Sequence, residues 1–305
     1  MGRIDPNLAG GTGSAPRARR RGLGAPGSAT TRTGLGAPGY APRPFRYTSG
    51  PMQKQAWTWT TARLPQTARM ARWGHFGAPV VIFPTAGGDF EEIERFQLVA
   101  ALGELIDGGR IKVYSVDAIA ARAWLAANTS PQECVRLEER YDSFLYEDVL
   151  RRIRVDCQND RIEPILVGAS IGAAAAVSTL CRHPDSFRAA IGLSGVYTNV
   201  YGGGYGGAHG GSFGPNIGGN PEFGGNLEFA SLATLAGPQL DRLRQRVIIL
   251  GSGAGDYENP AETKRLADTL GSKGVACRLE LWGPTRDHTW STWRDMLPRL
   301  LAGQI

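Results

Sequence analysis

The sequence predicts an α/β protein in which helices cover both faces of a mostly parallel central sheet. Short, continuous apolar runs at 79–83, 164–167 and 247–250 are typical of strands that are buried on both faces. Segments with helical periodicity separate these runs, and this alternation indicates parallel strands joined by crossover helices. With 305 residues, 42% of them hydrophobic, the chain is long enough for one large domain with appendages.

Residues 1–50 differ in composition from the rest of the chain. They consist mainly of Gly, Ala, Pro, Arg, Ser and Thr, and Gly-Leu-Gly-Ala-Pro-Gly occurs at 22–27 and again at 34–39. Such a segment has too little apolar surface to offset the entropy lost on ordering. We therefore predict a disordered N-terminal tail over 1–50, followed by a single domain over 51–305.

The positive charge of the chain is concentrated in this tail. The net charge is +6, but residues 1–50 hold eight arginines against one acid, Asp5, which leaves 26 basic and 27 acidic residues elsewhere. The domain is thus nearly neutral, which makes nucleic acid an unlikely partner. The tail could anchor an acidic partner, although a solvated tail is the interpretation we prefer.

The hydrophobic pattern and the cysteine spacing predict a cytoplasmic protein without a membrane span. The sequence has no run of 18 apolar residues, and the segment after Arg21 lacks the hydrophobic core of a secretory signal. The four cysteines, Cys134, Cys157, Cys181 and Cys277, form no C-x-x-C pair, which favours a reducing compartment.

Local patterns predict the individual elements. The β-rich segments 56–64 and 68–73 are expected to form an opening antiparallel hairpin. Asp89 and Glu92 have the spacing of a capping box, which predicts a helix from Asp89 through the apolar positions up to Leu102. Pro131 after Ser130 predicts the start of a long helix. The other predicted strands are 79–83, 111–115, 164–167, 189–193, 247–250 and 276–282, and the predicted helices that follow are 131–154, 171–183, 261–272 and 290–301.

A glycine-rich insert interrupts this alternation at 201–226. Nearly half of its residues are glycine, with aromatic residues between them. The insert follows the strand at 189–193, where a lid or substrate loop would lie. Composition leaves two interpretations open, a flexible aromatic lid and an insertion without a role.

The strongest chemical signal is Gly168-Ala169-Ser170-Ile171-Gly172, which directly follows a predicted strand and opens a predicted helix. This is the context of a nucleophile elbow, a turn so tight that glycine is needed two residues on either side of the serine. We predict Ser170 as a nucleophile. The alternative is an ordinary strand-to-helix turn in which Ser170 caps the helix.

A serine nucleophile needs a general base, and His288 is the predicted one. It lies in a loop between the last predicted strand and the closing helix. His75 precedes a strand, His183 ends a helix where a bonded C-terminal histidine is the simpler interpretation, and His209 lies in the glycine-rich insert.

The acid that orients this base should lie between serine and histidine in chain order. Asp256 is the predicted acid, because it follows the strand 247–250 through a flexible glycine-containing turn. Asp241 precedes that strand and would lie at the wrong end of the sheet. Asp287 is adjacent to the base, and neighbouring loop residues usually point apart. Glu258 is the second choice.

The oxyanion hole of such a site needs two backbone amides. Ile171, the residue after the nucleophile, is predicted to give one, and Ala86 or Gly87 in the glycine-containing turn at 84–88 the other. A glycine-rich turn before a helix can also bind phosphate, but the sequence has no P-loop motif and Asp89 would repel a phosphate.

With these residues in place, the chain resembles the α/β-hydrolase superfamily, and within it the bacterial esterases related to esterase D and the mycolyltransferases. The resemblance implies a Ser170–Asp256–His288 triad, activity on small-molecule esters, and no metal or organic cofactor. It departs from many lipases at Pro84-Thr-Ala-Gly-Gly88, which stands in place of a His-Gly-Gly-Gly motif. The resemblance covers roughly 55–303 and rests on 83–92, 168–187, 192–195 and 282–298.

The predicted function is hydrolysis of a carboxyl ester through an acyl-enzyme. An acyltransferase would use the same residues with a different acceptor. A non-catalytic binding protein on the same fold is the alternative from another class, and the basic tail and the insert are the features that favour it.

Overall fold

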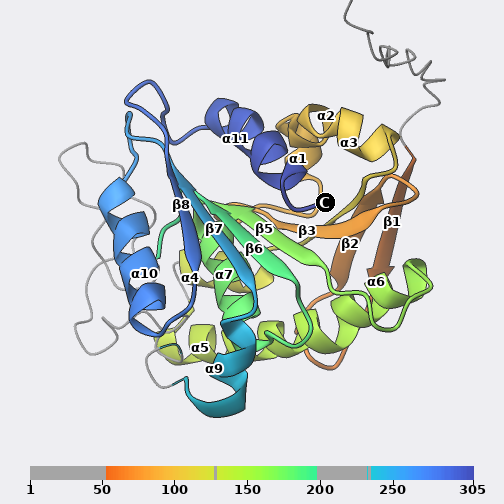
Figure 1. Ribbon diagram of the computed structural model, residues 1–305. Coiled ribbons are helices and arrows are strands. Elements are labelled where there is room, and N and C mark those ends of the chain that lie inside the picture. The colour runs from red at the N-terminus through yellow and green to blue at the C-terminus, as the bar shows by residue number, and fades with distance from the viewer. Residues whose placement is uncertain (1–52, 127–128, 198–231, 233–234) are drawn as a thin grey trace, which may run out of the picture. The chain divides into compact units, whose positions relative to one another are not determined.

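The computed structural model describes residues 53–126, 129–197, 232 and 235–305 (Figure 1). The predicted tail, 1–50, and the glycine-rich insert, 201–226, lie outside the described residues.

The described chain contains one eight-stranded sheet in the order β1-β2-β4-β3-β5-β6-β7-β8. β1 pairs antiparallel with β2, and β2 pairs antiparallel with β4, whereas all other neighbours are parallel. The predicted hairpin and the mostly parallel sheet are therefore confirmed. The strands are β1 (Lys54–Trp59), β2 (Ala68–Trp73), β3 (Ala78–Phe83), β4 (Ile111–Val116), β5 (Ile165–Ala169), β6 (Ala189–Leu193), β7 (Val247–Ser252) and β8 (Cys277–Leu281).

Helices cover both faces of this sheet, and each face has its own apolar core (Figure 1). Alternate residues of one strand enter different cores: Val80 and Ile82 pack on one face, and Val81 and Phe83 on the other. α1 (Glu92–Arg95), α2 (Leu98–Ala101), α3 (Gly103–Asp107) and α11 (Trp290–Ala302) cover the first face. α4 (Ile119–Leu125), α5 (Pro131–Phe144), the π-helical η1 (Leu145–Val149), α6 (Leu150–Asp156), α7 (Ile171–Arg182), α9 (Gly237–Leu243) and α10 (Pro260–Ser272) cover the second.

The predicted single helix from Asp89 is wrong, because the chain forms three short helices there. Gln97 has φ 63, a left-handed conformation that interrupts the helix between α1 and α2. The predicted capping box is also absent: the Asp89 side chain accepts from the amide of Glu91, and the Glu92 carboxylate bonds to Thr85. The Glu92 carboxylate thus accepts two hydrogen bonds from Thr85 in the preceding loop and makes no capping bond at the start of the helix.

The long helix predicted from Pro131 is confirmed. The Ser130 hydroxyl accepts a hydrogen bond from the Glu133 amide at 3.2 Å, as expected of an N-cap. The helix continues through α5, the π-helical η1 and α6 to Asp156. Among the helices of the described chain, none has the length and apolarity needed to cross a membrane.

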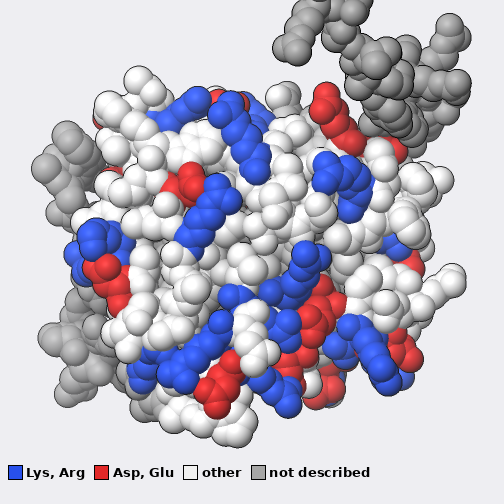
Figure 2. Space-filling view, viewed as in Figure 1, with Lys and Arg blue, Asp and Glu red and all other residues white. Residues whose placement is uncertain are grey.

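Basic and acidic side chains are interspersed on the face of the described domain that Figure 2 shows. Several form ion pairs at the amino ends of the parallel strands, such as Arg246 with Glu163 at 2.8 Å and Arg242 with Asp185 at 3.4 Å. This mixture agrees with the nearly neutral composition of the sequence after residue 50.

Candidate active site

Ser170 lies at the turn between β5 and α7, at the carboxyl edge of the sheet, and is partly exposed. Its backbone has φ 57 and ψ −125, a conformation that non-glycine residues adopt at a cost of about 1–3 kcal/mol. Hydrogen bonds hold it there: its amide donates to Leu193 O at 2.9 Å, and its carbonyl accepts from Ala173 at 3.1 Å and Val196 at 3.3 Å. The turn therefore presents the serine in a strained geometry fixed from both sides.

The two glycines of the elbow are required by close backbone contacts. A Cβ at Gly168 would lie 2.0 Å from Gly172 O, and a Cβ at Gly172 would lie 2.5 Å from Pro84 O. Both distances are shorter than any real carbon–oxygen contact, and the atoms met are backbone atoms that cannot turn away. The contact of Gly172 with Pro84 also joins the elbow directly to the loop that follows β3.

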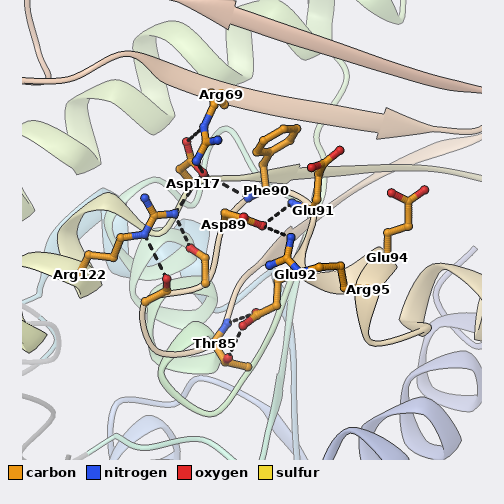
Figure 3. Close-up of polar contacts among 12 residues, drawn as sticks. Arg69, Thr85, Asp89, Phe90, Glu91, Glu92, Glu94, Arg95, Asp117 and Arg122 are labelled. Atoms are coloured by element: carbon orange, nitrogen blue, oxygen red, sulfur yellow. Dashed lines mark hydrogen bonds and ion pairs between the residues drawn. The ribbon is translucent and has the colours of Figure 1, made fainter.

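The loop after β3 carries amides that remain unused. The Gly88 amide donates to Thr85 O at 3.1 Å, and the Thr85 amide donates to Glu92 Oε2 at 2.7 Å (Figure 3). Within the described chain, the amides of Ala86 and Gly87 donate no hydrogen bond, and neither does the amide of Ile171 at the start of α7. The loop and the elbow thus offer unpaired donors from two adjoining segments.

The loops that carry Asp256 and His288 are joined through their backbones. The His288 amide donates to Asp256 O at 2.9 Å, and the Gly255 amide donates to Arg286 O at 2.9 Å. A Cβ at Gly253 would lie 2.0 Å from Arg286 O, so the loops could not approach this closely without glycine. The structure therefore joins the backbones of the predicted base and the predicted acid, and among the described residues no contact joins the His288 ring to the Asp256 carboxylate.

The ring of His288 is largely buried against Trp293. The two rings meet edge to face, with centroids 5.1 Å apart and planes at 86°. Burial lowers the pKa of His288 to about 4, because the charged imidazolium is poorly solvated there. At neutral pH the ring is therefore neutral and has a lone pair available to accept a proton.

Two carboxylates of the loop after β7 are candidates for the acid, and their surroundings differ. Asp256 is exposed, and its carboxylate makes no hydrogen bond within the described chain. Glu258 is largely buried and accepts from Ser194 Oγ at 2.5 Å and from Ser252 Oγ at 3.1 Å. Burial raises the pKa of Glu258, against the opposing effect of these hydrogen bonds.

A chain of contacts connects the elbow to the base through Ser194, which sequence reasoning missed. Ser194 follows β6 with φ 47, between the two residues whose backbones bond to Ser170. Its hydroxyl accepts from Trp293 Nε1 at 3.0 Å while it donates to Glu258. Since Trp293 also contacts the His288 ring, these contacts link the segment that holds Ser170 to the loop that carries His288.

The other histidines in the described chain have different surroundings. His183 bonds Asp142 at 3.0 Å and stacks on Tyr146, as expected of a bonded histidine at a helix end. His75 is exposed, and His209 lies outside the described residues. In the part of the chain that the structure describes, no group of three His, Cys, Asp or Glu side chains is arranged to hold a metal ion.

Comparisons with known proteins agree with this geometry. Residues 104–304, more than half of the chain, match the family model Esterase, described as "Putative esterase". No curated protein matches the sequence at a significant level. Among solved structures, a ferulic acid esterase is similar with a TM-score of 0.62 and 16% identity, covering 82% of this chain and 95% of that one.

Two further structures share the fold at low identity. An S-formylglutathione hydrolase from Agrobacterium tumefaciens has a TM-score of 0.57 and 12% identity, covering 82% of this chain and 93% of its own. The fluorophosphonate-binding serine hydrolase F of Staphylococcus aureus has a TM-score of 0.56 and 14% identity, covering 83% and 98%. The family match and the shared fold confirm the resemblance drawn from the sequence: the chain belongs to the Esterase family of carboxylic ester hydrolases and has the α/β-hydrolase fold.

Proposed function

We propose that this esterase cleaves small-molecule carboxyl esters through an acyl-enzyme on Ser170, with His288 as general base. The observation that carries the proposal is the strained Ser170, which is followed by the unpaired amide of Ile171 and whose elbow contacts, through Gly172, the loop that carries the unpaired amides of Ala86 and Gly87. A strained turn is retained where the surrounding structure enforces it, commonly at a reactive residue. The pairing with unused donors suits a reaction in which negative charge develops on oxygen.

The proposed reaction has two halves. Ser170 Oγ attacks the ester carbonyl carbon while His288 accepts the hydroxyl proton, which gives a tetrahedral oxyanion. The amides of Ile171 and of Ala86 or Gly87 donate to that oxyanion. The carbon–oxygen bond to the alcohol then breaks, and His288 returns the proton to the departing alcohol. In the second half, water adds with the same proton transfer and releases the carboxylic acid and Ser170.

Asp256 is the proposed partner of the His288 ring. Its loop is already bonded to the backbone of His288, and its carboxylate carries no competing hydrogen bond in the described chain. Both carboxylate oxygens of Glu258, by contrast, accept hydrogen bonds from serine hydroxyls. A rotation of the Asp256 side chain could bring a carboxylate to the imidazole, whereas Glu258 would first have to give up bonds in a desolvated site.

This assignment predicts different effects for two isosteric substitutions. We expect Asp256→Asn to lower kcat by about 10³- to 10⁴-fold, because the amide cannot stabilise the charged imidazolium. Glu258→Gln should lower kcat by about tenfold at most, since it is expected to act on His288 only through Ser194 and Trp293. Steady-state kinetics on a p-nitrophenyl ester gives both values, and the reverse order would assign the acid role to Glu258.

Covalent labelling tests the proposed function. The protein is treated with a fluorophosphonate, digested, and the modified peptide is located by mass spectrometry, with turnover of a short-chain p-nitrophenyl ester followed in parallel. We expect one phosphonylated residue, Ser170, and loss of turnover in proportion to labelling. Heat-unfolded protein is the control for non-specific reaction. A folded protein that is neither labelled nor active, or one labelled at another residue, would contradict the proposal.

A further inference from the structure

The loop proposed to stabilise the oxyanion is held by a cation from another element. Arg122, on α4, donates from Nε to Gly87 O at 3.1 Å and from Nη2 to Gly88 O at 2.7 Å (Figure 3). The guanidinium group is planar and rigid, so two bonds to consecutive carbonyls fix the orientation of both peptide groups. A lysine ammonium or a neutral side chain could not hold the loop in the same way.

Arg122 is itself held by a buried carboxylate. Its Nη2 lies 3.1 Å from Asp117 Oδ1, and the Asp117 side chain is only 2% exposed. Arg69 binds the same carboxylate with two hydrogen bonds, at 2.9 and 3.0 Å, and the Phe90 amide donates to it at 3.2 Å (Figure 3). A buried carboxylate with this many donors has few alternative arrangements, so Arg122 is fixed in turn.

The other end of the loop is held by Glu92. Its carboxylate accepts from the Thr85 amide at 2.7 Å and from the Thr85 hydroxyl at 2.8 Å. The loop is therefore bonded on its carbonyl side by Arg122 and on its amide side by Glu92. Because the N–H and C=O of a trans peptide point in opposite directions, turning the Gly87 carbonyl to Arg122 points the Gly88 amide away, to Thr85 O.

These bonds account for the donors that remain. Of the amides at positions 85–88, those of Thr85 and Gly88 are used, and in the described chain those of Ala86 and Gly87 are not. These are the two amides proposed for the oxyanion hole. We propose that Arg122 is a positioning residue, which acts through the carbonyls of Gly87 and Gly88 to keep the oxyanion donors oriented before substrate binds. The inference rests on the proposed acyl-enzyme mechanism.

The test compares the variants Arg122→Gln and Arg122→Lys with Arg95→Gln as matched control. Arg95 is exposed and pairs with Asp89 at 2.7 Å, just after the same loop, but does not bond its carbonyls. Kinetics on a p-nitrophenyl ester are normalised to the number of sites that react with a fluorophosphonate. A trifluoromethyl ketone, which forms a tetrahedral adduct with a serine, then reports on oxyanion binding through its Ki.

We expect Arg122→Gln to lower kcat per reactive site by about 10- to 100-fold with KM changed less than threefold, somewhat below the effect of deleting an oxyanion donor outright. Ki for the ketone should rise in proportion to the fall in kcat/KM, and Arg122→Lys should recover part of both. Arg95→Gln should match the wild type. A structural role alone would lower the number of reactive sites and the Tm without changing kcat per site.

The outcomes separate the two proposals. An active wild type whose Arg122 variants keep kcat per reactive site and Ki unchanged would overturn the positioning role and leave the proposed function standing. If Arg122→Gln does not fold, Arg122→Lys takes its place: a rise in Ki in proportion to the fall in kcat/KM supports the positioning role, and unchanged values overturn it. A wild type that neither turns over ester nor labels at Ser170 would overturn the proposed function and this inference with it.

Discussion

Replacing Ser170 with alanine is expected to lower kcat for ester hydrolysis by about 10⁴- to 10⁶-fold and to abolish fluorophosphonate labelling. The change removes the attacking oxygen and leaves the elbow intact, because the contacts of Gly168 and Gly172 involve backbone only. A residual rate above that of water is expected, since the amides of the oxyanion hole remain in place. Initial rates at high enzyme concentration, compared with those of a mock preparation, measure this residual rate. A variant with one tenth of wild-type activity would exclude Ser170 as the nucleophile.

The backbone strain at Ser170 supplies a matched control for this variant. Ser170→Ala keeps a Cβ in the strained conformation, whereas Ser170→Gly removes it. We expect both variants to be inactive, and the glycine variant to gain about 1 kcal/mol in free energy of unfolding over the alanine variant. Urea denaturation measures the difference. Equal stability would show that the strain at this turn is no larger than the unfolded-state entropy cost of glycine, about 0.4–1 kcal/mol.

Replacing His288 with asparagine should lower kcat by about 10⁴-fold or more, because the proposed mechanism assigns the transfer of the serine proton to this ring alone. His75→Asn is the matched control, since His75 is exposed and precedes the amino end of β3, whereas Ser170 lies at the carboxyl edge of the sheet, and it should retain wild-type activity. In the wild type, the lowered pKa of His288 keeps the base in its neutral form down to about pH 4. The acid limb of kcat/KM should therefore lie well below the ordinary histidine value of about 6.5.

The same pKa makes stability depend on pH. Between about pH 6.5 and 4 the unfolded chain binds a proton at His288 that the folded protein does not, so the free energy of unfolding falls as the pH is lowered. The difference in pKa corresponds to about 3 kcal/mol over this window. Urea denaturation between pH 4 and 7 should show a shallower dependence for His288→Asn. An unchanged dependence would mean that the ring is better solvated than its contact with Trp293 indicates.

The central parallel strands could be predicted from sequence because they are buried on both faces. Five of the six residues of β3 and all five of β5 are buried, and such positions give a continuous apolar run. β8 lies at the edge of the sheet and alternates charged positions, Arg278 and Glu280, with apolar ones. Its alternation and its glycine-containing flanks were still sufficient to predict it.

The broken helix after β3 could not be predicted, because its apolar positions follow the period of one continuous helix. The break at Gln97 reflects tertiary contacts instead. Phe96, 44% exposed, leaves the helix face to stack on Trp290 with ring centroids 4.8 Å apart. That partner lies almost two hundred residues away in the chain, and periodicity carries no information about it.

A candidate site residue could be proposed from the sequence only where its neighbours in the chain or its position between two predicted elements mark it. Ser170 is marked by two obligatory glycines, and His288 by its position between β8 and α11. Arg122 binds backbone carbonyls, which every residue possesses, so no partner in the sequence marks it. Asp256 and Glu258 are two positions apart in one loop, and only the folded chain shows that Asp256 is exposed whereas Glu258 is partly buried.

The contact between Gly172 and Pro84 joins the elbow of the proposed site to the loop after β3 through backbone atoms. It sets the spacing between nucleophile and oxyanion loop by main chain alone, so that spacing is insensitive to which side chains surround it. The loops after β6, β7 and β8 lie on the other side of β5 in the sheet order, and they carry Val196, Asp256 and His288, so only their remaining residues can change without affecting the proposed site. Substitutions at those remaining loop positions are therefore a route to a different substrate specificity that keeps the proposed reactive residues and their spacing unchanged.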